Sequence, residues 1–166
     1  IGPRVLDVGA GPGVVAALVA HRFPHVHVTA TDSSAAMIEA GTAYVADKGL
    51  GERIQFAQGD AEDAVFMASL GTFDFAYSTF TLHHWHDPQA VLRNLHGLLN
   101  EGGTLFLYDL RRAWWLAWVP LRSGFWRCLR GAYLLPEVHA LLADSGIANA
   151  KVESLFPFLL SALARP

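Results

Sequence analysis

Short apolar runs alternate along the chain with longer stretches in which apolar and polar residues recur at helical spacing. The runs are rich in valine, phenylalanine and threonine, and they end at acids or glycines, which is typical of buried strands. The longer stretches end near glycine or proline, as helices do. The pattern predicts strands at residues 4–8, 25–30, 53–57, 73–79 and 104–109, helices at 14–22, 34–48, 61–69, 88–99 and 136–144, and a closing hairpin of 151–156 and 158–163 turned at Pro157.

Strand–helix alternation of this kind predicts a doubly wound α/β fold in one domain, residues 1–166. An apolar content of 52% with only 16% charged residues suits a sheet that is buried on both faces. Only residues 111–135 break the alternation. That segment holds five arginines, no acid and four of the five tryptophans. We interpret it as a basic, aromatic insert between the last parallel strand and the last helix.

Charge and cysteine content limit the binding partners and the cellular compartment that we expect. The net charge of -3 argues against a protein that binds polyanions. The single cysteine, Cys128, cannot form an internal disulfide, which favours a reducing, cytoplasmic compartment. No signal peptide is visible, and no apolar run reaches the roughly 18 residues of a membrane span. The chain opens on Ile1 and enters a strand almost at once, so a segment upstream is expected.

The stretch VLDVGAGPG carries the first candidate chemistry, because a strand runs into Gly9, Gly11 and Gly13. Bare backbone there lets a ligand approach the start of the next helix. Dinucleotide folds use G-x-G-x-x-G, whereas Val14 holds the sixth position here, and no G-K-[ST] phosphate loop follows. Asp7, just before the loop, would repel a pyrophosphate. The loop therefore favours a nucleoside-like ligand that is cationic at this point; a tight turn without a ligand is the alternative.

Acids also follow the next two predicted strands. Asp32 ends the stretch HVTATD and can accept both hydroxyls of a ribose. It can instead cap the following helix, a role that Ser33 and Ser34 can also fill. Asp60 follows the third strand. Because the carboxyl ends of parallel strands share the edge where open α/β sheets bind ligands, we expect Asp7, Asp32 and Asp60 to lie at one site.

Four ordered motifs resemble the class I S-adenosylmethionine-dependent methyltransferases, in particular their small-molecule (methyltransferase type 11-like) subgroup. They are D-V-G-A-G-P-G at 7–13, D-S-S-A-A-M at 32–37, G-D-A-E at 59–62 and L-H-H-W-H-D-P at 82–88. The resemblance covers residues 4–110. It implies a Rossmann-like, mostly parallel sheet of order 3-2-1-4-5-7-6 with an antiparallel C-terminal hairpin strand. The helices that precede the first strand in this family are missing here, and the part after residue 110 resembles nothing specific.

The resemblance also implies S-adenosyl-L-methionine as the cofactor. Its cationic ammonium and sulfonium match the cation inferred from Asp7. The implied contacts are Asp7, Gly9, Ala10, Gly11 and Gly13 with the methionine part, Asp32 and Ser33 with the ribose, Met37, Asp60 and Ala61 with the adenine, and Ser78 and Thr79 beside the methyl group. For Met37, packing in the core is an equal alternative.

Methyl transfer is an in-line displacement on an activated sulfonium, so the protein would mainly position the reactants and exclude water. His83 and His84 follow the fourth strand, where an acceptor would meet the methyl group, and either could take a proton from a weak acceptor. Packing or capping of the turn is the alternative. Either Tyr108 or Asp109, at the end of the fifth strand, could orient the acceptor; packing and solvation of the strand end is the alternative. No cysteine or acid stands at ligand spacing from these histidines, so no metal site is expected.

The insert at 111–135 leaves three interpretations open: a lid over an apolar or acidic acceptor, a helix on a membrane surface, or a homodimer interface. If residues 121–133 are helical, one face is apolar and the other carries Arg127 and Arg130. The apolar face would comprise Leu121, Phe125, Cys128, Leu129 and Ala132.

These observations predict a methyltransferase that acts on a small, apolar or lipid-like acceptor of the secondary-metabolite kind. The alternative is a methyltransferase-like module that binds the cofactor, or nothing, and serves in assembly. A nicotinamide-dependent dehydrogenase is opposed by the glycine spacing and by Asp7. No nucleic-acid partner is expected, because the chain outside the insert is acidic and S-T-F-T stands where an N-P-P-[YF] motif would follow the fourth strand.

Overall fold

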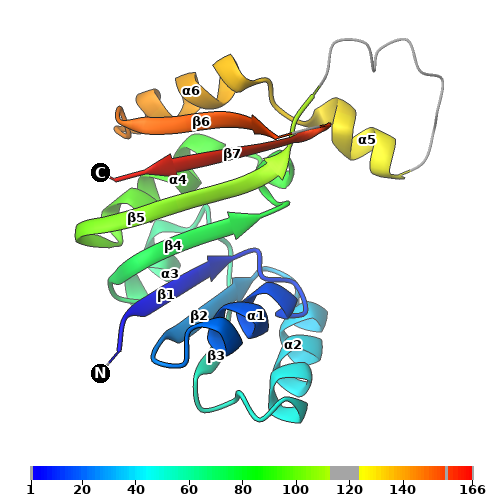
Figure 1. Ribbon diagram of the computed structural model, residues 1–166, viewed down its shortest axis with the longest axis vertical. Helices are drawn as coiled ribbons and strands as arrows, with labels where there is room; N and C mark the ends of the chain where they lie inside the picture. Colours follow the sequence, from blue (N-terminus) through cyan, green and yellow to red (C-terminus); the bar gives the residue numbers. More distant parts are fainter. Residues whose placement is uncertain (1, 113–123, 156, 166) are drawn as a thin grey trace.

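The computed structural model describes residues 2–112, 124–155 and 157–165. Their backbone forms a seven-stranded sheet of order β3-β2-β1-β4-β5-β7-β6 (Figure 1). Strands β1 to β5 pair in parallel, and β7 runs antiparallel between β5 and β6. The predicted α/β class and strand order are confirmed. The strands are β1 Arg4–Val8, β2 His27–Asp32, β3 Ile54–Gln58, β4 Phe73–Thr79, β5 Leu99–Leu110, β6 Ala150–Leu155 and β7 Leu159–Ala164.

Helices connect the strands in the expected order. Asp87 caps α4 by accepting from the backbone N–H of Ala90, and Pro88 occupies its first turn. None of the helices in the described ranges combines the length and apolarity needed to cross a membrane. The helices are α1 Val14–Arg22, α2 Ala35–Asp47, α3 Ala64–Ser69, the 3₁₀ turn η1 Leu82–His84, α4 Pro88–Gly97, α5 Gly124–Gly131 and α6 Leu135–Asp144.

Several element boundaries differ from the sequence-based prediction. Strand β5 begins at Leu99 instead of residue 104, because Leu99 already pairs with Phe73 ahead of a register shift in the β4–β5 ladder. Helix α3 begins at Ala64 instead of residue 61, because Asp63 caps it by accepting from two backbone N–H groups. Strand β2 begins at His27 instead of residue 25. None of these shifts changes the order of the elements.

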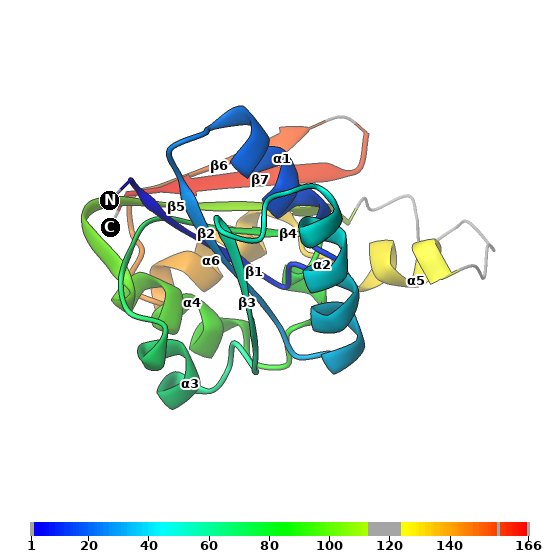
Figure 2. The same cartoon turned by 90° about the horizontal axis from the view of Figure 1, so that it is seen from below.

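The sheet is covered on both faces. Helices α1 and α2 bury Ala16, Ala20 and Val45 against one face. Helices α3, α4 and α6 cover the other face, where the larger apolar cluster includes Leu92 and Leu142 (Figures 1 and 2). Because side chains alternate along a strand, neighbouring residues of β1 enter opposite clusters. Asp7 therefore lies on the side of α1.

Helix α5 lies beyond the carboxyl end of β5, outside the two layers of helices (Figure 1). Its buried residue Leu129 packs with Ala132 and with Leu110 of β5, and burial of such a leucine contributes roughly 2 kcal/mol. Cys128 packs at the edge of the same cluster. The expected apolar face is confirmed for Cys128, Leu129 and Ala132, and the predicted position of Leu121 lies outside the described residues.

Candidate functional site

A cavity of about 290 Å³ opens beyond the carboxyl ends of β1, β2 and β3, and we call it the first cavity. It lies at the sheet edge where the acids were expected to meet. Ligands of open α/β sheets bind at this edge, because the loops that leave the strands converge there. The first cavity is lined by Val8, Gly9, Thr31, Asp32, Ser33, Gly59, Asp60, Ala61, Glu62, Thr81, His84, Trp85 and His86.

The glycine loop begins at the edge of this cavity, which Gly9 lines. Gly9, Gly11 and Gly13 all have positive φ angles, of 72°, 53° and 73°, a conformation that glycine adopts without steric cost. The backbone N–H of Gly9 donates to the carbonyl of Thr31 at 2.9 Å and ties the loop to β2. A Cβ on Gly9 would overlap the side chain of Thr81. The loop thus brings bare backbone to the cavity, and its conformation depends on glycine.

Two carboxylates at strand ends are held in place by backbone N–H groups. Asp32 accepts from Gly11 N and from Ser34 N, both at 2.9 Å. Asp60 accepts from Glu62 N at 2.9 Å. A carboxylate has about four lone-pair sites, so each keeps capacity for further donors. Both residues line the first cavity, which makes them candidate acceptors for ligand hydroxyl and amino groups.

Asp7 lies fully buried beside the glycine loop, on the face of β1 that packs under α1. The Tyr77 hydroxyl donates to its Oδ2 at 2.8 Å, whereas its Oδ1 has no hydrogen-bond partner among the described residues. Burial raises the pKa of Asp7 from 3.8 to about 7, although the hydrogen bond from Tyr77 lowers it in part. A buried carboxyl with one unpartnered oxygen fits a cation placed next to it.

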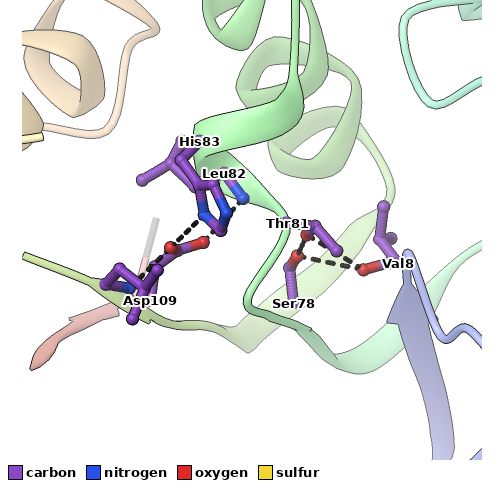
Figure 3. A network of polar contacts seen from close by, with 7 residues as sticks. Val8, Ser78, Thr81, Leu82, His83 and Asp109 are labelled. Atoms are coloured by element: carbon purple, nitrogen blue, oxygen red, sulfur yellow. Dashed lines mark hydrogen bonds and ion pairs between the residues drawn. The ribbon is translucent and has the colours of Figure 1, made fainter. Parts of the chain in front are cut away.

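The end of β4 is tied to β1 by two hydroxyl groups (Figure 3). Ser78 donates to the carbonyl of Val8 at 2.9 Å, and its Oγ also contacts the Oγ1 of Thr81. Thr81 lines the first cavity, whereas the buried Ser78 does not. Of these two residues, therefore, only Thr81 borders the cavity.

His83 and Asp109 form a buried pair at the ends of β4 and β5 (Figure 3). The Nδ1 of His83 lies 2.6 Å from Asp109 Oδ1, and the two side chains are only 4% and 2% exposed. Asp109 is itself fixed, because it accepts from the backbone N–H of Leu82 at 2.7 Å and of Leu110 at 2.6 Å. This network holds the His83 ring through Nδ1, and its Nε2 forms no hydrogen bond with the residues that the structure describes.

A second cavity, of about 420 Å³, adjoins these histidines. His84 lines both cavities, and its ring centroid lies 4.0 Å from that of His83. Burial, and secondly the neighbouring His83, lower the pKa of His84 below its usual value. Helix α5 supplies the opposite wall. The second cavity is lined by His83, His84, Gly124, Arg127, Cys128 and Gly131.

Of the cofactor contacts expected from sequence, the first cavity gathers five: Gly9, Asp32, Ser33, Asp60 and Ala61. Ala10 and Gly11 lie half-buried in the loop, Gly13 is buried at the start of α1, and Thr79 is the half-buried last residue of β4. Met37 lies on α2 with 40% of its surface exposed. The roles of these residues stay predictions.

Some residues of the two cavities had no role in the sequence analysis. Thr31 and Thr81 line the first cavity, and only their nearness to the motifs could have indicated them. Cys128 was expected on the buried face of a helix, and no spacing in the sequence connects it to the histidines. Of the segment 111–135, residues 113–123 lie outside the described part of the chain, so its three interpretations rest here on α5 alone.

The fold and these cavities define a Rossmann-like α/β domain with a ligand site at the carboxyl edge of its sheet. The profile of the methyltransferase domain family matches residues 5–103. The match covers more than half of the chain, so the chain belongs to this family of methyltransferase domains.

Individual relatives agree with this assignment. The chain is 32% identical over 145 residues to a demethylmenaquinone methyltransferase of Porphyromonas gingivalis, covering 87% of this chain and 56% of that protein. It is 30% identical over 103 residues to a malonyl-[acyl-carrier protein] O-methyltransferase of Paenibacillus sp., covering 62% and 37%. A methyltransferase structure from Aquifex aeolicus shares the fold, with a TM-score of 0.78, 21% identity and 98% and 81% coverage. The chain spans about half or less of the length of these curated relatives.

Proposed function

We propose that the chain binds S-adenosylmethionine in the first cavity and transfers its methyl group to a small-molecule acceptor in the second cavity. One observation carries the proposal: Gly9 of the glycine loop, Asp32 and Asp60 line a single cavity, and His84 borders both that cavity and the second. When bound, the cofactor supplies a methyl group activated by a sulfonium. The residues present fit it, because a buried carboxyl at Asp7 lacks a partner for one oxygen.

The contacts of each carboxylate suggest its role toward the cofactor. Asp32, anchored by two backbone N–H groups, accepts from the ribose hydroxyls with its remaining lone pairs. Asp60 accepts from the adenine amino group. Asp7 holds the ammonium group, directly or through water, and the cation favours its ionised form.

The chain contributes to the transfer mainly by positioning and by exclusion of water. The acceptor atom approaches in line with the bond that breaks, from the side of the second cavity. His83, fixed by Asp109, and the adjacent His84 contact the acceptor there. Besides Arg127, the wall on α5 consists of Cys128, Gly124 and Gly131, and these three residues suit an apolar or lipid-like acceptor of the secondary-metabolite kind. Two relatives carry names that refer to small or carrier-bound acceptors, which supports this class.

For the insert at 111–135 we propose the lid among its three interpretations. Residues of α5 line the second cavity opposite the histidines, so this part of the insert already borders the acceptor. A membrane surface helix predicts co-sedimentation with anionic vesicles, and a homodimer interface predicts a dimer in sedimentation equilibrium. A monomer that stays in the supernatant is the result expected for a lid.

Calorimetric titration with S-adenosylhomocysteine tests the cofactor site. We expect one molecule bound per chain and no heat with NAD. Asp32→Asn removes a charged acceptor of hydrogen bonds, each worth about 1.5–3 kcal/mol, so it should weaken binding by about 10- to 100-fold. Asp47→Asn is the matched control, because Asp47 ends α2 with its side chain 79% exposed and away from both cavities.

Two outcomes would contradict the proposal. If S-adenosylhomocysteine gives no heat with a folded protein, the assembly module becomes the better account. If NAD binds instead, a nicotinamide-dependent dehydrogenase becomes the better account. Once binding is established, transfer of a labelled methyl group from S-adenosylmethionine to a panel of thiols, phenols and quinols identifies the acceptor class.

A further inference from the structure

Three metal-ligating side chains from two distant parts of the chain meet at the second cavity. His83 and His84 come from the turn η1 after β4, and Cys128 comes from α5. One potential ligand atom from each lies within 4.8 Å of the other two. In a tetrahedral zinc site such atoms lie about 3.3–3.6 Å apart, given the usual zinc–nitrogen and zinc–sulfur bond lengths. His84 is exposed and Cys128 is half-buried, so rotation of these two side chains can shorten the separations.

The surroundings of His83 match those of a metal-bound histidine. Its Nδ1 contacts the carboxylate of Asp109 at 2.6 Å, and a carboxylate on the second ring nitrogen is the usual partner of a metal ligand. Asp109 is held in turn by two backbone N–H groups. The Nε2 of His83 is therefore presented in a fixed direction, before any ion arrives.

Cys128 is held beside the histidines by packing. Its neighbour Leu129 is fully buried against Leu110 of β5, which fixes this turn of α5. The side chain of Cys128 remains half-buried at the wall of the second cavity. If His83 acted only as a free imidazole base, that role would explain its contact with Asp109 but not the position of the Cys128 thiol beside it. Two imidazoles and one thiolate together form a ligand set that zinc prefers.

We infer that His83, His84 and Cys128 bind a zinc ion at the second cavity, with Asp109 as the positioning residue of His83. This proposal differs from the expectation of no metal site, which rested on spacing along the sequence. Three protein ligands leave a fourth position open to an external ligand, as in catalytic zinc sites. The exposed Arg127 borders the same cavity and favours an anion in that position.

The position of the zinc ion suggests a role in methyl transfer. This role rests on the proposed function, whereas the metal site itself does not. An acceptor with an S–H or O–H group takes the fourth position as its anion and releases its proton to solvent. A lone pair of that sulfur or oxygen forms the new bond to the methyl carbon. The bond from methyl to the cofactor sulfur breaks, and its electron pair stays on that sulfur.

Titration of the metal-free chain with Co²⁺ tests the site, because a cobalt–thiolate bond gives a charge-transfer absorption. Cys128 is the only cysteine of the chain, so this absorption has a single source. We expect one Co²⁺ per chain with that absorption, displaced by Zn²⁺. Cys128→Ser should abolish the absorption, and His84→Asn should weaken binding at least about 10-fold.

Asp109→Asn tests the positioning residue, and it should weaken Zn²⁺ binding by about 10- to 100-fold. Circular dichroism checks that each variant is folded. His139→Asn is the matched control, because His139 is exposed on α6 and lies outside the cluster. Its affinity for Zn²⁺ should equal that of the unchanged chain.

A folded chain that gives no thiolate absorption would overturn the inference and leave His83 as a free imidazole. The same conclusion follows if the absorption survives in Cys128→Ser, or if His84→Asn binds as tightly as the unchanged chain. The metal titration contains no cofactor. Its failure is therefore distinct from failure of the proposed function, which the S-adenosylhomocysteine titration reports.

Discussion

Replacing Asp7 by asparagine should change how the stability of the fold depends on pH. The carboxyl of Asp7 is fully buried, and burial raises its pKa from 3.8 to about 7. The folded protein therefore binds this proton more tightly than the unfolded chain does. The stability contribution is fully present below pH 3.8 and is lost as the pH rises through about 7.

The two pKa values set the size of the effect. One pKa unit corresponds to about 1.4 kcal/mol, and the loss accumulates only between the unfolded and the folded value. From about pH 5 to about pH 8 the free energy of unfolding should fall by roughly 3 kcal/mol relative to a side chain that cannot ionise. Asparagine also places an amide group where Asp7 Oδ1 has no partner. That adds an offset of about 1–3 kcal/mol that does not depend on pH.

Urea unfolding followed by tryptophan fluorescence at several pH values between about 5 and 8 measures this difference. Subtracting the Asp7→Asn curve from that of the unchanged chain removes the titration of all other groups. Asp74→Asn is the control. Hydrogen bonds from the Asn100 amide and the Arg4 backbone N–H lower the pKa of Asp74, so its difference should be flat over this range. A flat difference for Asp7→Asn as well would refute the reasoning.

Three further substitutions test the hydrogen bond between Tyr77 and Asp7 and the conformation of the glycine loop. Tyr77→Phe removes the hydrogen bond that the Tyr77 hydroxyl donates to Asp7, so the pH at which stability declines should move upward in the same urea series. An unchanged midpoint would mean that this bond does not affect the pKa of Asp7. Gly9→Ala places a Cβ against Thr81 at positive φ and should lower the free energy of unfolding by about 1–3 kcal/mol. Gly11→Ala meets no atom within 4 Å and should cost only the backbone strain, so equal losses from both variants would contradict the contact with Thr81.

The acids of the first cavity could be predicted from sequence because their determinants are local. Asp32 ends one recognisable strand, Asp60 closely follows the next, and parallel strands bring their carboxyl ends to one edge. The same reasoning could not predict on which face of the sheet the side chain of Asp7 lies. Its side chain follows the alternation of β1 into the cluster under α1, where it meets Tyr77 of the adjacent strand. That contact depends on the register of two strands far apart in the chain.

The second cavity depends on packing between elements that no short motif connects. The apolar spacing of Cys128, Leu129 and Ala132 predicts which face of α5 is buried, and the structure confirms that face. The apolar spacing does not predict what this face packs against, because any apolar surface of the right size can bury the same residues. Only the docking of Leu129 on Leu110 of β5 places Cys128 beside His83. A ligand set assembled in this way has no characteristic spacing, so its absence from the sequence is not evidence against the site.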